Sequence, residues 1–271
     1  WSEQAKLSAS DLTQSSFGAA VAVSGDTIVV GAPDKNLGPS ILQGQAYVFV
    51  RSGATWSEQA KLVGSDSGRD DRFGNAVAVS GETAVIGAYF HDDKGALKQG
   101  EAYVFVRSGA SWTEQATLVA SDRKPLDWFG SSVSVSGDVA LIGASAKSLG
   151  GGTDHQGKAY VFVRSRALWT EQAALLAADG TPGDYFGTAV AVSGETAVVT
   201  APYKTVGATS RQGQAYVFVR SGSSWSFAQQ LVASDGKAGD DLGESVSVDG
   251  DTAILGAPKR SAAAGLAPGQ A

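Results

Sequence analysis

The sequence predicts an all-β protein, a β-propeller built from four-stranded antiparallel blades. A segment that begins Phe17-Gly18 and ends Gly31-Ala32-Pro33 recurs along the 271 residues, with later copies from residues 73, 129, 186 and 242. The fifth copy begins Leu242-Gly243, and the full Gly-Ala-Pro returns only at 256–258. The copies are spaced by 56 or 57 residues, and a constant period of this size is typical of stacked supersecondary units. Large and small residues alternate within each copy, which is the two-residue period of a strand.

The first two strands of each unit form a hairpin. Val21 and Val23 alternate with small residues, so one face of the first strand is bulky and the other is small. Residues 24–27 read Ser-Gly-Asp-Thr, and glycine suits such a tight turn because it adopts positive φ without a Cβ clash. Residues 28–30, Ile-Val-Val, then form the returning strand.

The third and fourth strands are equally regular. Residues 46–51 read Ala-Tyr-Val-Phe-Val-Arg, and the same six letters return at 102, 159 and 215. An Arg-Ser-Gly turn connects this strand to a fourth strand that starts at a tryptophan, although the third copy reads Arg164-Ser165-Arg166. The tryptophans in register are Trp1, Trp56, Trp112, Trp169 and Trp225. Four such strands per unit match a propeller blade, and a β-solenoid is the alternative architecture.

Residues 1–271 are predicted to form a single propeller domain with blades from about 17, 73, 129, 186 and 242. The fifth blade would share the N-terminal strand over residues 1–7, and residues 259–271 match the loop that precedes a third strand. We expect either a five-bladed ring closed by the termini or part of a longer propeller. The incomplete fifth blade also suggests self-association.

The Phe-Gly and Gly-Ala-Pro pairing resembles the FG-GAP repeat of the integrin α-subunit head and of many bacterial surface proteins. The Trp-x-Glu-Gln and Ala-Tyr-Val-Phe-Val-Arg segments are more similar to the bacterial extracellular branch. The resemblance implies a propeller and a secreted or cell-surface location. A chain that begins at Trp1 and contains no methionine fits removal of a signal peptide or larger precursor, or a cut at a repeat boundary. Integrin-type repeats often carry an Asp-x-Asp-x-Asp-Gly calcium loop. Here the interval holds only a short hairpin, which does not support a calcium site, so no cofactor is expected and calcium is kept only as the alternative.

The composition of the chain excludes several classes of binding partner and of chemistry. The net charge is −6 and no block of basic residues occurs, so nucleic acid is not an expected partner. No apolar run reaches the roughly 18 residues that span a bilayer, so membrane insertion is not expected either. The absence of cysteine excludes disulfides and thiolate chemistry.

Acidic residues recur in the loop between the fourth strand and the next unit. Such a set could form weak cation sites, but aspartates also cap turns through their side-chain oxygens, and the turn interpretation is favoured. The weak metal candidates are Asp66, Asp70, Asp122, Asp127, Asp179, Asp184, Asp235 and Asp240.

The residues that differ between copies are the better functional candidates. Most are aromatic and lie on the face that carries the long loops, where function is expected on a rigid scaffold. They could bind a protein or a glycan, or merely pack the tops of the blades. The candidate ligand-binding residues are Tyr89, Phe90, His91, Trp128, His155, Tyr185 and Tyr203.

Catalysis is not expected. The chain has no Gly-x-Ser-x-Gly motif, and two isolated histidines make a poor acid/base pair. The acids beside them, Asp92, Asp93 and Asp154, are only a weak metal signal. The sequence therefore favours a non-enzymatic extracellular binding or adhesion module, with a propeller lectin as the alternative and a hydrolase less favoured.

Overall fold

The computed structural model describes residues 2–11, 15–92, 97–150 and 154–260. We number the repeat units 1 to 5 from the Phe-Gly positions at 17, 73, 129 and 186 and from the equivalent Leu242-Gly243. The strands of units 1 to 4 are β1 (Ala20–Ser24), β2 (Thr27–Ala32), β3 (Gln45–Ser52), β4 (Thr55–Leu62), β5 (Ala76–Ser80), β6 (Thr83–Ala88), β7 (Glu101–Ser108), β8 (Ser111–Leu118), β9 (Phe129–Ser136), β10 (Val139–Ala144), β11 (Lys158–Ser165), β12 (Leu168–Leu175), β13 (Val190–Ser193), β14 (Thr196–Ala201), β15 (Gln214–Ser221) and β16 (Ser224–Leu231). Unit 5 contains β17 (Ser245–Asp249) and β18 (Thr252–Gly256).

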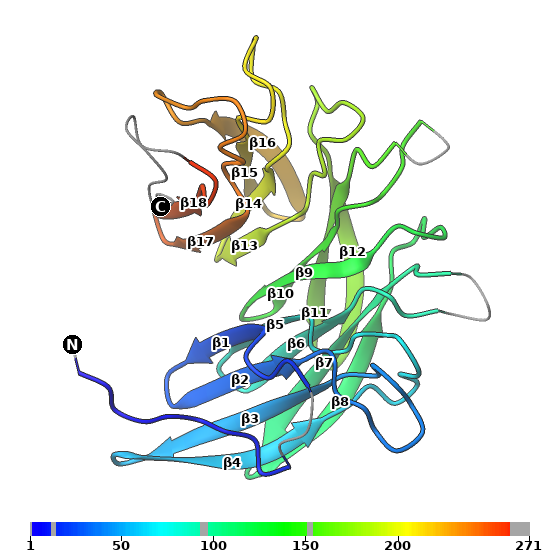
Figure 1. Cartoon of the computed structure of the whole chain (residues 1–271), viewed down its shortest axis with the longest axis vertical. Helices are drawn as coiled ribbons and strands as arrows, with labels where there is room; N and C mark the ends of the chain where they lie inside the picture. Colours follow the sequence, from blue (N-terminus) through cyan, green and yellow to red (C-terminus); the bar gives the residue numbers. More distant parts are fainter. Residues whose placement is uncertain (1, 12–14, 93–96, 151–153, 261–271) are drawn as a thin grey trace.

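Each of units 1 to 4 is a four-stranded antiparallel sheet in which the strands lie in sequence order, and unit 5 is a two-stranded hairpin. The prediction of all-β propeller blades is therefore confirmed. The units follow one another around an arc, with β1 and β17 in its two end units (Figure 1). The described residues contain no helix of the length and apolarity needed to cross a bilayer.

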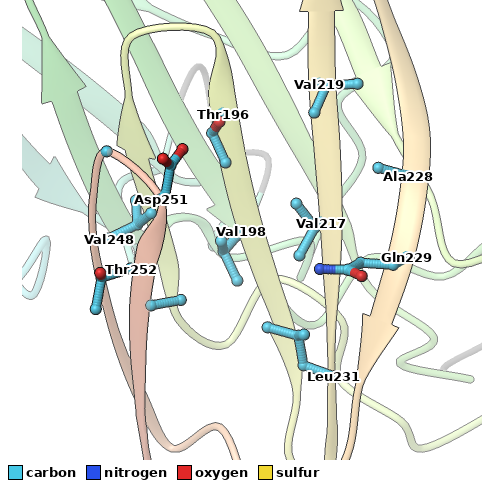
Figure 2. A pocket seen from close by; sticks show the side chains of 12 residues that line it. Thr196, Val198, Val217, Val219, Ala228, Gln229, Leu231, Val248, Asp251 and Thr252 are labelled. Atoms are coloured by element: carbon cyan, nitrogen blue, oxygen red, sulfur yellow. The ribbon is translucent and has the colours of Figure 1, made fainter.

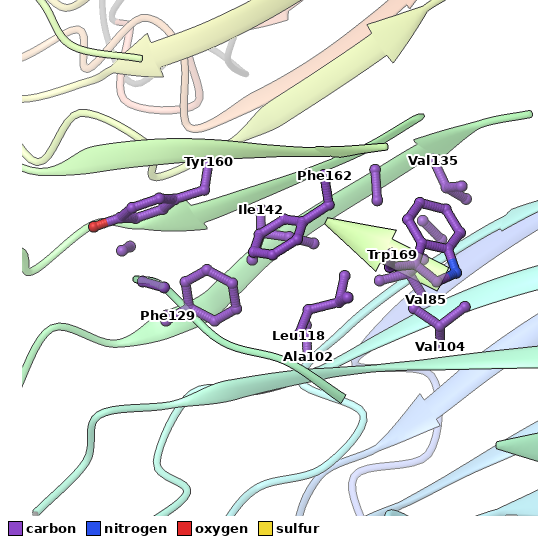
Figure 3. Close-up of a cluster of buried hydrophobic side chains, with 14 residues drawn as sticks. Val85, Ala102, Val104, Leu118, Phe129, Val135, Ile142, Tyr160, Phe162 and Trp169 are labelled. Carbon is purple, nitrogen blue, oxygen red and sulfur yellow. The ribbon is translucent and has the colours of Figure 1, made fainter. Parts of the chain in front are cut away.

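Neighbouring units pack face to face. One face of each sheet presents valine and alanine, and the next sheet meets it with phenylalanine, tyrosine and tryptophan (Figure 3). Between units 2 and 3, Val104 and Leu118 pack in one cluster with Phe129 and Phe162. Because apolar area removed from water stabilises by about 25 cal/mol per Å², these interfaces hold the arc together.

A β-bulge between the third and fourth strands connects the units further. In unit 1 the register shifts between Val48 and Phe49, which leaves Gln59 without a pairing partner in the ladder. The side-chain Oε1 of Gln59 accepts a hydrogen bond of 3.0 Å from the indole N–H of Trp112 in unit 2. The same contact recurs from Trp169 to Gln115 and from Trp225 to Gln172.

The Phe-Gly and Gly-Ala-Pro motifs meet across the unit boundary. A Cβ built on Gly87 would lie 2.1 Å from the carbonyl oxygen of Gly130, the glycine of the next Phe-Gly. The same close approach joins Gly31 to Gly74 and Gly143 to Gly187. At these three boundaries glycine is favoured because the two backbones touch there, whereas Thr200 takes the place of the first glycine in unit 4.

The first strands gather at the centre of the arc. β1 contacts β5, β5 contacts β9, β9 contacts β13, and β13 contacts β17. Residues of all five strands, among them Val23, Val79, Val135, Val192 and Val248, line one central cavity. The described residues do not close a ring, because β17 and β1 make no comparable contact.

The N-terminal segment differs from expectation. A strand was predicted over residues 1–7, but the described residues 2–9 form none. The fourth strand of a blade pairs only with the third, and β18 has no third strand beside it among the described residues. Leu7 and Ala9 pack instead on the aromatic face of unit 1, and the Ser10 N–H donates to Glu58 Oε2 at 2.8 Å.

Candidate functional site

In units 1 to 4, two loop positions hold side chains in left-handed backbone conformation. The residue before each Phe-Gly has positive φ, and in units 3 and 4 it is Trp128 (57°) and Tyr185 (54°). The residue two places before the third-strand glycine is also left-handed, and in unit 3 it is His155 (47°). The backbone thus fixes the direction of these side chains, while their identity varies from unit to unit.

Six of the seven candidate ligand-binding residues form one continuous row across units 2 to 4. Trp128 lies edge to face with Tyr89 and Phe90, at centroid distances of 6.0 and 5.9 Å. On its other side Trp128 stacks on His155 at 6.3 Å, and His155 stacks on Tyr185 at 5.2 Å. Tyr185 meets Tyr203 edge to face at 5.3 Å. We call this set the aromatic row: Phe90, Tyr89, Trp128, His155, Tyr185 and Tyr203.

Cationic side chains flank both ends of the aromatic row. Lys98 Nζ lies 4.0 Å from the ring centroid of Phe90, and the guanidinium of Arg211 lies 4.4 Å from that of Tyr203. Arg211 also pairs with Asp241 at 2.8 Å. All six members of the row are partly exposed. A small pocket beside Phe90 is lined by Asp70, Arg72, Asp92 and Lys98.

Trp128 carries an unsatisfied donor. Its indole N–H is buried and has no acceptor among the described residues. An unmade hydrogen bond of this kind costs about 1–3 kcal/mol, and such groups in folded proteins call for an explanation.

His91, the seventh candidate, does not belong to the aromatic row. It is only 6% exposed, and its Nδ1 lies 2.8 Å from Asp71 Oδ2. Burial alone would lower the pKa of His91, but the hydrogen bond to Asp71 and the charges of Glu101 and Asp66 outweigh it and raise the pKa. The sequence placed both histidines on the long-loop face, yet only His155 joins the row.

The recurring aspartates hold the loops together. In the loops before units 2 to 4, the first acid accepts a hydrogen bond from a buried tyrosine of the next unit, as Asp66 does from Tyr103 at 2.7 Å. Burial, followed by this hydrogen bond, raises the pKa of Tyr103 above its ordinary value. The same pairing joins Asp122 to Tyr160 and Asp179 to Tyr216, while Asp235 contacts Arg260.

The second acid of each loop is buried and closes a turn. Asp127 Oδ2 accepts the backbone N–H of Lys124 at 2.6 Å, and Asp184 and Asp240 bond the backbone N–H three residues earlier in the same way. In unit 2 the equivalent residue is Asp71, which accepts from Gly68, whereas Asp70 is exposed and pairs with Arg69. Such hydrogen bonds are the ones expected if these aspartates cap turns rather than bind a cation. Burial raises the pKa of Asp127, although Lys147 and the Lys124 N–H counteract it.

The sequence reasoning missed a recurring cation between these acids. In unit 3, Lys147 is 1% exposed, and its Nζ lies 2.7 Å from Asp127 Oδ2 and 3.3 Å from Asp122 Oδ1. Lysine takes the same place at Lys35 and Lys204, and Arg260 does so in unit 5. In unit 2 the residue is His91. We call this place the cation position. The sequence feature that could have revealed it is a basic residue four places after the first residue of each Gly-Ala-Pro segment.

The remaining acids beside the histidines have local partners. Asp154 accepts backbone hydrogen bonds from Leu149 and Gly150, and Asp92 accepts one from Lys98. Asp93 lies outside the described residues.

Comparison with known proteins agrees with the geometry. No curated protein matches the chain as a relative. The family model of the FG-GAP repeat matches it five times, over residues 1–49, 56–105, 112–162, 169–218 and 225–271. These matches cover almost all of the chain, and their repeated motifs are the glycines that touch between units. The chain therefore belongs to the FG-GAP repeat family.

Proposed function

We propose that the protein is a non-enzymatic binding or adhesion module, secreted or on the cell surface, whose ligand contacts the aromatic row. One observation carries the proposal. Residues that differ between copies, and so are not needed to build a blade, form one continuous surface across units 2 to 4.

The chemistry of the row suits a binding surface. Partly exposed aromatic rings offer a large apolar area with few rotatable bonds, and tryptophan, tyrosine and arginine are the residues that most often dominate binding energy. The cations at each end of the row, Lys98 and Arg211, can orient a ligand through their charge.

A protein ligand and a glycan are both compatible with this chemistry. The extent of the row across three units favours a protein, because a specific protein contact buries about 800 Å² on each partner. A glycan is the second candidate, because the partly exposed ring of Tyr203, at one end of the row, has the charged side chain of Arg211 beside it.

The test replaces Trp128 and Tyr185 by serine, the residue that unit 1 has at the same position. Ser16 holds the equivalent left-handed position (φ 49°), so Trp128→Ser with Tyr185→Ser should leave the fold intact. The fluorescently labelled double variant and wild type are compared on a glycan array and on an array of extracellular proteins. We expect the double variant to lose at least tenfold in affinity for whichever array component binds wild type.

A matched control removes apolar surface from the opposite face. Leu168, the first residue of β12 after the short turn that follows β11, is 66% exposed, and Leu168→Ser should bind like wild type. Equal binding by the double variant, or equal loss in the control, would contradict the proposed surface.

Self-association is a further part of the proposal. A groove lies between the valine face of β14, β15 and β16 and the hairpin of unit 5 (Figure 2). In the other units this face is covered by the third and fourth strands of the next unit, but Val219 is 40% exposed here. The uncovered Val21 and Val23 of unit 1, 60% and 64% exposed, belong to the opposite type of face, so a second copy could pack there head to tail.

Sedimentation velocity across a range of concentrations tests this association. Val219→Asp should shift the equilibrium towards monomer. A wild type that stays monomeric at every concentration would refute a second copy as the occupant.

A further inference from the structure

Unit 2 lacks the basic residue that the other units place between their loop acids. At the cation position, units 1, 3 and 4 have a buried lysine and unit 5 has Arg260. Unit 2 has His91, and it also has Glu101 where units 1 and 4 have Gln45 and Gln214. The unit has thus exchanged a permanent positive charge for an imidazole and gained a carboxylate.

The exchanged residues converge with the loop acids. His91 Nε2 lies 3.7 Å from Glu101 Oε2, and Arg123 lies 3.5 Å from the other oxygen of Glu101. One nitrogen of His91 and one oxygen each of Asp66 and Glu101 all lie within 4.8 Å of one another. Three donors of metal-ligand type therefore meet where a lysine ammonium sits in neighbouring units.

Asp71 orients the imidazole. A carboxylate can only accept, so the 2.8 Å contact places the proton of a neutral His91 on Nδ1 and leaves the Nε2 lone pair directed away from Asp71. A carboxylate behind a histidine is the usual support of a metal-ligating imidazole, because it fixes the tautomer and raises the basicity of the ring.

We propose that unit 2 binds one divalent transition-metal ion, such as Zn²⁺, through His91, Asp66 and Glu101. Zinc takes imidazole nitrogen and carboxylate oxygen at about 2.0–2.2 Å, so the three donors need to draw together by about 1 Å. His91 and Glu101 are buried, whereas Asp66 is exposed, so an ion can reach the site from solvent on the side of Asp66.

The donor set selects against calcium. Ca²⁺ and Mg²⁺ are hard cations that prefer six or more oxygen ligands or several retained waters, whereas imidazole favours zinc and related ions. The metal site is separate from the proposed ligand-binding surface, because none of its three residues belongs to the aromatic row.

The repeat provides a matched control. His91→Lys with Glu101→Gln gives unit 2 the pair found in unit 1 (Lys35, Gln45) and unit 4 (Lys204, Gln214), so the variant should fold. Asp66→Asn is a second variant that removes one ligand charge and retains an oxygen that can accept from Tyr103.

Isothermal titration with ZnCl₂ and with CaCl₂ at pH 8, after treatment with EDTA, tests the proposal, with circular dichroism to verify folding. We expect one zinc per wild-type chain, at least a tenfold loss of affinity in Asp66→Asn, no zinc binding in the double variant, and no calcium binding in any form. Absence of zinc binding in wild type, or equal binding in the double variant, would overturn it. Calcium binding of wild type at equal strength would overturn the assignment to a transition metal.

Discussion

At the scale of the residue, backbone strain recurs at fixed places in every unit. The short turn between the third and fourth strands uses glycine with φ near 60° at Gly53, Gly109 and Gly222, whereas unit 3 has Arg166 at 59°. A non-glycine residue in this region costs about 1–2 kcal/mol, partly offset by the lower entropy of its unfolded chain.

Arg166→Gly should therefore stabilise the protein by about 0.5 kcal/mol. The free energy of unfolding from urea titration measures this gain. The reverse change, Gly109→Arg, serves as the control and should destabilise. A loss of stability in Arg166→Gly would mean that the arginine makes a compensating contact.

The exposed acid Asp122 predicts a dependence on pH. Burial would raise its pKa, but hydrogen bonds from Lys158 and Tyr160 and the charge of Lys147 outweigh it and lower the pKa to about 2. A carboxyl group whose folded pKa is depressed stabilises above its unfolded value, about 3.9, and that contribution is lost as the pH falls from about 5 towards 2.

In Asp122→Asn the deficit in melting temperature relative to wild type should be largest at pH 6 and should shrink towards pH 2. The side chain is 43% exposed, so solvent screening keeps the effect below about 1 kcal/mol. Thermal melts at a series of pH values measure it, and a deficit that stays constant from pH 6 to pH 2 would contradict the assignment.

At the scale of the element, the family motif is explained by contact between backbones. Gly87 has no room for a Cβ because the carbonyl oxygen of Gly130 occupies that place. Gly81 in the preceding hairpin has φ of 55° and open space around it. The two glycines therefore differ in the physical reason for which they are needed.

We expect Gly87→Ala to destabilise by about 3 kcal/mol, at the upper end of overpacking costs, and Gly81→Ala by about 1 kcal/mol from left-handed strain alone. Chemical denaturation of both variants makes the comparison. If both variants lost the same free energy of unfolding, the close contact between units at Gly87 would not be the reason for its glycine.

Most of the strands were predictable from the sequence because hydrophobic alternation and tight turns are local properties. The β-bulge at Gln59 and the absence of a strand over residues 2–9 were not predictable, because both depend on the strand that is available to pair with the segment. Trp128 and Tyr185 were found as departures from the repeat, while the continuity of the row required the loop geometry. The cation position was visible as a repeated basic residue, but only the fold brings it between acids of the preceding loop.

At the scale of the whole molecule, the units are equivalent frameworks that differ at a few positions. Their shared residues form the interfaces, the turns and the Tyr-Asp pairs that hold each loop. Among the residues that differ are those of the aromatic row and the residue at the cation position of unit 2. The central claim is that these few differences decide what each unit can bind.

An exchange between units tests that claim most directly. Unit 4 has the same loop acids, Asp179 and Asp184, around Lys204. Lys204→His with Gln214→Glu should therefore give unit 4 the donor set of unit 2. Zinc stoichiometry by isothermal titration should be one in wild type, none after His91→Lys with Glu101→Gln, and two after the unit 4 exchange. A stoichiometry that does not follow the exchanged residues would contradict the account.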